Sequence, residues 1–174
     1  MREPTVKFRF TPPAPGCALV ALDSSQLENS SLRPEEASLL PGNAAEKRKS
    51  EFVLGRAAAH RALAELGFAE SPPVLRGAGR EPLWPAGVVG SITHCSSRAI
   101  AVVAKTEKVQ AIGIDLEDVD HFPEEIADLV ANEAERDWVL SEDSRLRLAM
   151  LFSAKESIYK AFYPLEHRFF DFHG

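Results

Sequence analysis

The 174-residue sequence lacks the features that mark secreted, membrane-spanning or nucleic-acid-binding proteins. It has two cysteines, Cys17 and Cys95, which form no CxxC pair and are too few for a disulfide framework. No apolar run approaches the roughly 18 residues that a membrane-spanning helix needs. Residues 1–10 contain no apolar segment of the secretory type. The net charge of −6 argues against a general nucleic-acid-binding protein. These absences favour a cytoplasmic enzyme.

The hydrophobic content is 45%, which is ordinary for a globular protein with a real core. The length allows one domain or two small fused halves. Apolar periodicity and turn residues together predict a mixture of helices and strands. The expected strands are residues 17–22, 88–93, 99–104 and 109–116, the last three as a meander. The expected helices are residues 34–40, 44–66, 123–130, 132–140 and 143–162, with Asn132 as an N-cap and Pro164 ending the last. The apolar stripe of the last helix is expected in the core; it consists of Leu148, Leu151, Phe152, Ile158 and Phe162.

A short apolar run, residues 110–117, ends in two carboxylates, Asp115 and Glu117. Because strand side chains alternate between faces, residues two apart point the same way. Asp115 and Glu117 are therefore expected to share one face, with Leu116 turned into the core. Carboxylate oxygens are ligands that hard divalent cations such as Mg²⁺ accept.

A second segment, residues 152–160, has the sequence FSAKESIYK and is expected to be helical. Lys155 and Glu156 are adjacent, and Lys160 follows Glu156 by one turn on the same face. A helical Lys–Glu pair is most often a solvated surface feature. Taken with Asp115 and Glu117, however, the segment completes a set of three carboxylates and two lysines. That set suits a magnesium–pyrophosphate site, because lysine supplies a point charge for phosphate oxygens.

Two arginines stand out on the predicted helix 44–66. Arg56 falls on its apolar stripe between Phe52 and Ala59, and Arg48 lies one turn before Phe52. A charge in this position needs a partner. One interpretation is that both side chains extend along the apolar surface to reach water. The other is that they bind an anionic ligand.

Three ordered motifs resemble those of the 4'-phosphopantetheinyl transferases. The family patterns G-[IV]-D-x-E and [WF]-x-x-K-E-[AS]-x-x-K match GIDLE at residues 113–117 and FSAKESIYK at residues 152–160. A third block, REPLWP at residues 80–85 through GSITHC at residues 90–95, resembles the enterobactin synthetase component D and surfactin-type branch. Phe152 stands where many relatives have tryptophan, and this branch shares that change.

The resemblance implies an α+β fold of two pseudo-symmetric halves, here about 1–109 and 110–174, with the site at their junction. The whole chain is then one phosphopantetheinyl transferase domain. The sequence ends at RFFDFHG, whereas the family continues after a comparable segment with further strands. The second half is therefore expected to be incomplete.

The resemblance also implies an activity, the transfer of 4'-phosphopantetheine from coenzyme A to a serine of an acyl- or peptidyl-carrier protein. The reaction depends on Mg²⁺, although Mn²⁺ suits the same oxygen ligands. The product released is adenosine 3',5'-bisphosphate. Partners are expected in nonribosomal peptide or siderophore assembly, with fatty-acid and polyketide carriers left open. A monomer that binds neither nucleic acid nor membrane is expected.

The same resemblance assigns roles to individual residues. The expected metal ligands are Asp115, Glu117 and Glu156, and the catalytic residues are Glu156, as the base, and Lys160. The expected coenzyme A contacts are Arg48, Arg56, Arg80, Thr93, His94, Lys155 and Lys160.

Three alternatives remain open beside the transferase. The chain could bind coenzyme A or a carrier protein without turnover, as an impaired or truncated binding module. It could hydrolyse nucleotide pyrophosphates, although it has no P-loop. A purely structural protein would leave the charged residues of the three motifs unexplained.

Overall fold

The computed structural model describes residues 12–95, 97–169 and 171–172. The segment 1–10, examined above for a secretory signal, lies outside them. The strands are β1 (Cys17–Asp23), β2 (Leu75–Arg76), β3 (Pro82–Leu83), β4 (Val88–Cys95) and β5 (Arg98–Lys105). The α-helices are α1 (Pro34–Ala37), α2 (Glu46–Glu65), α3 (Ala127–Val130), α4 (Glu133–Val139) and α5 (Ser144–Glu166). Short 3-10 helices span Ser24–Asn29, Val119–His121 and Glu124–Ile126. The expected α+β class is confirmed.

An antiparallel sheet of order β1-β5-β4 forms the centre of the fold. Its middle strand, β5, pairs Ala101 with Val20 of β1 on one side and with Ile92 of β4 on the other. Six consecutive residues of β5, 99–104, are buried, as expected for a strand covered on both faces. The strands predicted from residues 17–22, 88–93 and 99–104 are confirmed, each with slightly different ends.

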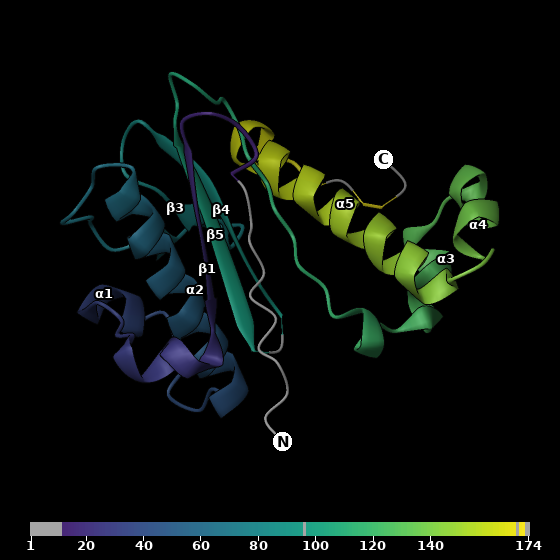
Figure 1. The fold of residues 1–174 in the computed structure, drawn as a ribbon, viewed down its shortest axis with the longest axis horizontal. Helices are drawn as coiled ribbons and strands as arrows, with labels where there is room; N and C mark the ends of the chain where they lie inside the picture. Colours follow the sequence, from purple (N-terminus) through teal and green to yellow (C-terminus); the bar gives the residue numbers. More distant parts are fainter. Residues whose placement is uncertain (1–11, 96, 170, 173–174) are drawn as a thin grey trace.

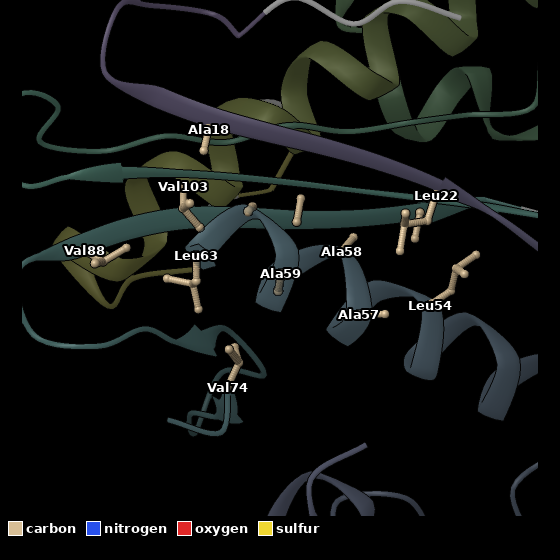
Figure 2. Close-up of a cluster of buried hydrophobic side chains, with 13 residues drawn as sticks. Ala18, Leu22, Leu54, Ala57, Ala58, Ala59, Leu63, Val74, Val88 and Val103 are labelled. Carbon is tan, nitrogen blue, oxygen red and sulfur yellow. The ribbon is translucent and has the colours of Figure 1, made fainter. Parts of the chain in front are cut away.

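Helix α2 covers one face of the sheet through its small residues (Figure 2). Ala58, Ala59 and Ala62 are fully buried there, together with Leu63. Small side chains let the helix backbone approach the sheet closely; a Cβ built on Gly55 would lie 3.1 Å from Ile92. The predicted helix 44–66 is therefore confirmed.

The segment 110–118 crosses the opposite face of the sheet, and the strand predicted for residues 109–116 is wrong. Two hydroxyls on β4 accept its backbone N–H groups. Ser91 Oγ accepts from Ile114 at 3.2 Å, and Thr93 Oγ1 accepts from Leu116 at 3.1 Å. Alternation along β4 places both hydroxyls on the face away from α2. Because side chains replace the backbone ladder, the segment is not a strand and the expected meander does not form.

Helix α5 lies beyond this segment, with α3 and α4 at one end of it (Figure 1). A second hydrophobic cluster joins these helices around Phe122, Val130, Val139 and Leu148. The predicted cap at Asn132 is confirmed, since its side chain accepts from Glu135 N at 3.1 Å.

The apolar pattern of α5 and its surroundings was only partly informative about burial. Leu148 is buried as expected. Ile158 and Phe162, predicted as core, are 56% and 51% exposed. Pro164 does not end the helix, which continues to Glu166. Proline has no N–H to donate to the carbonyl of Lys160, but only two residues of the helix follow it. None of the helices in the described ranges combines the length and apolar character needed to cross a membrane.

Candidate functional site

Asp115 is held at the centre of the site by its neighbours in the chain. The hydrogen bonds of Ile114 and Leu116 to β4 fix the backbone on either side of it. Its Oδ1 accepts from Thr93 Oγ1 at 3.1 Å and from Lys160 Nζ of α5 at 2.5 Å. The side chain is only 5% exposed. The three motifs of the sequence therefore meet at one carboxylate.

Like charges accumulate around Asp115. Burial, followed by the charge of Asp115, raises the pKa of Glu117 to about 7. Burial also raises the pKa of Glu156 above its ordinary value; Lys160 opposes this shift, and Asp115 adds to it. The remaining oxygen of Asp115, Oδ2, is buried without a hydrogen-bond partner. A cation at this position would relieve both the repulsion and the unpaired oxygen.

The carboxylate oxygens here are ligands that suit a hard divalent cation. A side-chain hydrogen bond with Asp115 also contributes to the raised pKa of Glu117. No group of three or more His, Cys, Asp or Glu side chains gathers within the described residues as a metal-binding cluster. The ammonium of Lys160, beside Asp115, is the cation in contact with that carboxylate. The predicted set of Asp115, Glu117 and Glu156 stays a prediction.

A cavity of about 140 Å³ between α2, β2, β3 and β4 has a strongly basic lining. We call it the arginine pocket; its titratable lining residues are Arg48, Arg56, Arg76, Arg80, Glu51 and His94. Arg56 is buried and lies 4.5 Å from the centre of the Phe52 ring. Burial lowers its pKa to about 10, so it remains a cation at neutral pH. Its buried Nε has no hydrogen-bond partner. Four guanidinium groups with one carboxylate among them suit an anionic ligand.

His94 lies between an arginine and a carboxylate of α2. Its Nε2 is 3.4 Å from Arg48 Nη1, and its Nδ1 is 3.6 Å from Glu51 Oε2. Burial lowers the pKa of His94, which favours the neutral imidazole. Glu51 and Arg76 were missed in the sequence. Glu51 follows Arg48 by one helical turn, which could have indicated it, but no local pattern distinguishes Arg76.

A second cavity, of about 200 Å³, borders the arginine pocket. Both cavities share Arg80, Pro82 and Ile92, and the second reaches Glu156 and Lys160. Arg80 has a positive φ of 71° in a tight turn, where Gly77 N donates to Glu81 O at 2.8 Å. Such a backbone costs energy and is often found at ligand sites. The two cavities are therefore neighbours with a common wall, and together they form the candidate site.

Lys155 is engaged elsewhere. Its ammonium donates to Val130 O at 2.8 Å, to Phe172 O at 2.7 Å and to Glu135 Oε2 at 2.6 Å. These bonds tie α5 to α3, to α4 and to the segment that follows α5, and they use all three protons. The predicted coenzyme A contact of Lys155 stays a prediction, but its position points to a structural role.

Replacing Lys155 by methionine should therefore destabilise the fold. The change removes the cation beside the Glu135 carboxylate, which keeps its bond from Asn132 N, and takes one donor from each of two carbonyl groups. The free energy of unfolding should fall by roughly 3 kcal/mol. Denaturant unfolding would measure it, with the exposed Lys108→Met as control. Unchanged stability combined with lost coenzyme A binding would instead support the ligand contact.

Comparison with known proteins identifies two family matches. Residues 33–104 match the 4'-phosphopantetheinyl transferase N-terminal domain, and residues 111–174 match the 4'-phosphopantetheinyl transferase superfamily. The 4'-phosphopantetheinyl transferase Npt of Nocardia iowensis is 43% identical over 83% of this chain and 65% of its own length. PptT of Mycobacterium tuberculosis is 41% identical over 80% of this chain and 61% of its own length.

Enterobactin synthase component D of Salmonella typhi is 42% identical over 69% of this chain and 50% of its own length. The chain thus spans between half and two thirds of the length of these curated relatives. One family match contains the arginine pocket, and the other contains Asp115, Glu117, Glu156 and Lys160. The chain belongs to the 4'-phosphopantetheinyl transferase superfamily.

Proposed function

We propose that the chain transfers the 4'-phosphopantetheine group of coenzyme A to a serine of an acyl- or peptidyl-carrier protein. The observation that carries this proposal is that a basic pocket and a cavity lined by Glu156 and Lys160 are neighbours, with Arg80 in the wall of both. A nucleotide bearing a 3'-phosphate and a pyrophosphate needs these two environments side by side. Adenosine 3',5'-bisphosphate would be the second product.

Different residues of the chain bind the nucleotide, accept the proton and neutralise the leaving group. Arg48, Arg56, Arg80 and His94 hold the nucleotide end of coenzyme A. The carrier serine attacks the β-phosphorus, a new P–O bond forms, and the bond from that phosphorus to the bridging oxygen breaks. Glu156 takes the serine proton, and its raised pKa makes it a stronger acceptor than an ordinary carboxylate. Lys160 neutralises charge on the departing bisphosphate.

Thr93 acts in this scheme through Asp115, to which it donates a hydrogen bond, besides its predicted contact with coenzyme A. Asp115, Glu117 and Glu156 would hold Mg²⁺ or Mn²⁺. The bound ion supplies charge neutralisation at the pyrophosphate oxygens. The orphaned Oδ2 of Asp115 supports this assignment.

The carrier proteins of nonribosomal peptide or siderophore assembly are the proposed partners, because one relative bears the name enterobactin synthase component D. We also propose that the chain comprises halves of about 1–109 and 110–174. The separation of its two hydrophobic clusters, one before residue 104 and one after residue 118, supports this division.

The direct test is the intact mass of an apo carrier protein after incubation with this chain, coenzyme A and Mg²⁺. A gain equal to the mass of phosphopantetheine, absent when the metal is chelated, is expected. A carrier of unchanged mass, tested with several carrier classes, would contradict the transferase.

A coenzyme A-binding module without turnover is the second candidate. One observation favours it: no three carboxylates of the described residues gather in a metal-binding cluster. Calorimetric binding of coenzyme A by a chain that transfers nothing would establish it.

A further inference from the structure

A carboxylate outside the candidate site is completely buried. Glu36 of α1 is 0% exposed. Its Oε1 accepts from Val74 N and from His60 Nε2, both at 2.8 Å, and its Oε2 accepts from Arg33 N at 3.0 Å. One side chain thus joins α1, α2 and the loop that leads into β2.

His60 extends this network to Ser71, whose Oγ lies 2.7 Å from His60 Nδ1. When Nε2 donates to the carboxylate, Nδ1 of a neutral ring accepts from the hydroxyl. A serine, a histidine and a glutamate are also the components of a hydrolytic relay. Ser71, however, is only 2% exposed, so no substrate can reach its hydroxyl. The three residues therefore do not form a hydrolytic relay, and Ser71 is a buried end of the network.

The groups it touches lead to the arginine pocket. His60 lies four residues after Arg56 on α2, so the two share a face of that helix. Val74 directly precedes β2, which ends at Arg76. The guanidinium groups of Arg56 and Arg76 lie 4.5 Å and 5.7 Å from the centre of the same Phe52 ring. Glu36 is therefore linked to two of the four pocket arginines, to Arg56 through α2 and to Arg76 through β2.

Electrostatics agrees with this geometry. The charge of Glu36 is the largest influence that opposes the burial-induced lowering of the Arg56 pKa. No hydrogen bond joins the two side chains in the described structure, so the carboxylate supports Arg56 by its field and leaves the guanidinium protons to the pocket.

We propose that Glu36 is a positioning residue that holds Arg56 and Arg76 in place for the anion bound in the arginine pocket. This inference rests on the proposed function. Two effects of removing the carboxylate oppose each other. The loss of a negative charge raises the positive potential of the pocket and favours an anion, whereas the displacement of Arg56 and β2 disfavours it. If Glu36 positions the arginines, the second effect is larger.

The experiment measures binding of adenosine 3',5'-bisphosphate by calorimetry, below the unfolding temperature of every variant. Glu36→Gln should weaken binding roughly tenfold, although it makes the pocket more positive. Glu107→Gln, in an exposed turn, makes the same charge change and should leave affinity within about twofold. In the transfer assay, Glu36→Gln should raise KM for coenzyme A and leave kcat nearly unchanged.

Two further variants separate position from charge and from stability. Glu36→Asp keeps the charge but cannot reach both Val74 and Arg33, so it should also weaken binding; it replaces Glu36→Gln should that variant fail to fold. Ser71→Ala should lower the unfolding temperature and leave affinity unchanged.

Equal or tighter binding by both Glu36 variants would overturn the inference and leave the proposed function intact. Weakening by Ser71→Ala as large as that of Glu36→Gln would also overturn it, because loss of stability alone would then explain the effect. Absence of binding by the unsubstituted chain would overturn the proposed function together with this inference.

Discussion

Replacing Glu156 by glutamine is expected to lower the rate of phosphopantetheine transfer by roughly a thousandfold, in line with the loss of a general base. Glutamine has nearly the same shape but cannot take the serine proton. Glu156 lines the cavity that Lys160 also lines, and its raised pKa suits proton transfer. Coenzyme A binding should survive, because the arginine pocket lies outside the substituted residue's reach.

The rate would be measured by carrier mass over time, and binding by calorimetry. Glu166→Gln, at the exposed end of α5, removes the same charge from the same helix and should transfer normally. Undiminished transfer by Glu156→Gln would contradict the role assigned to Glu156. Loss of coenzyme A binding together with transfer would show that Glu156 acts in binding rather than in proton transfer.

Replacing Gly113 by alanine should lower the free energy of unfolding by roughly 2–4 kcal/mol, the range of severe overpacking. A Cβ at this position would overlap the carbonyl oxygen of Ser157 and lie 2.7 Å from Ala161 N. Both are backbone atoms of α5, which cannot rotate away as a side chain does. The helix would have to move from the segment that carries Asp115, and it would take Lys160 with it.

Denaturant unfolding measures the stability change. Transfer activity should fall as well, even where the variant is folded, because the contact between Lys160 and Asp115 would lengthen. Gly42→Ala is the matched control, since a Cβ there meets nothing within 4 Å. A Gly113→Ala variant as stable and active as the control would mean that α5 does not pack this closely on the segment.

Local pattern predicted the elements that are long and periodic. Helix α2 and strands β1, β4 and β5 were found because their burial follows their own sequence. The apolar run before Asp115 led to a wrong prediction, since such a run forms a strand only where a neighbouring backbone offers hydrogen-bond partners. Here Ser91 and Thr93 accept the N–H groups instead. Ile158 and Phe162 show the converse, since apolar periodicity on α5 did not ensure burial.

Contiguous motifs were enough to indicate the family and to predict the three carboxylates and Lys160 as site residues. Which other residues lie near this candidate site could be read only from the tertiary structure. Arg76, Glu51 and Glu36 come from separate segments that only the packing of α1, α2 and β2 brings together. It also separated the two lysines of one motif: residues five apart on a helix point about 140° away from each other. Lys160 therefore meets Asp115, while Lys155 meets Glu135.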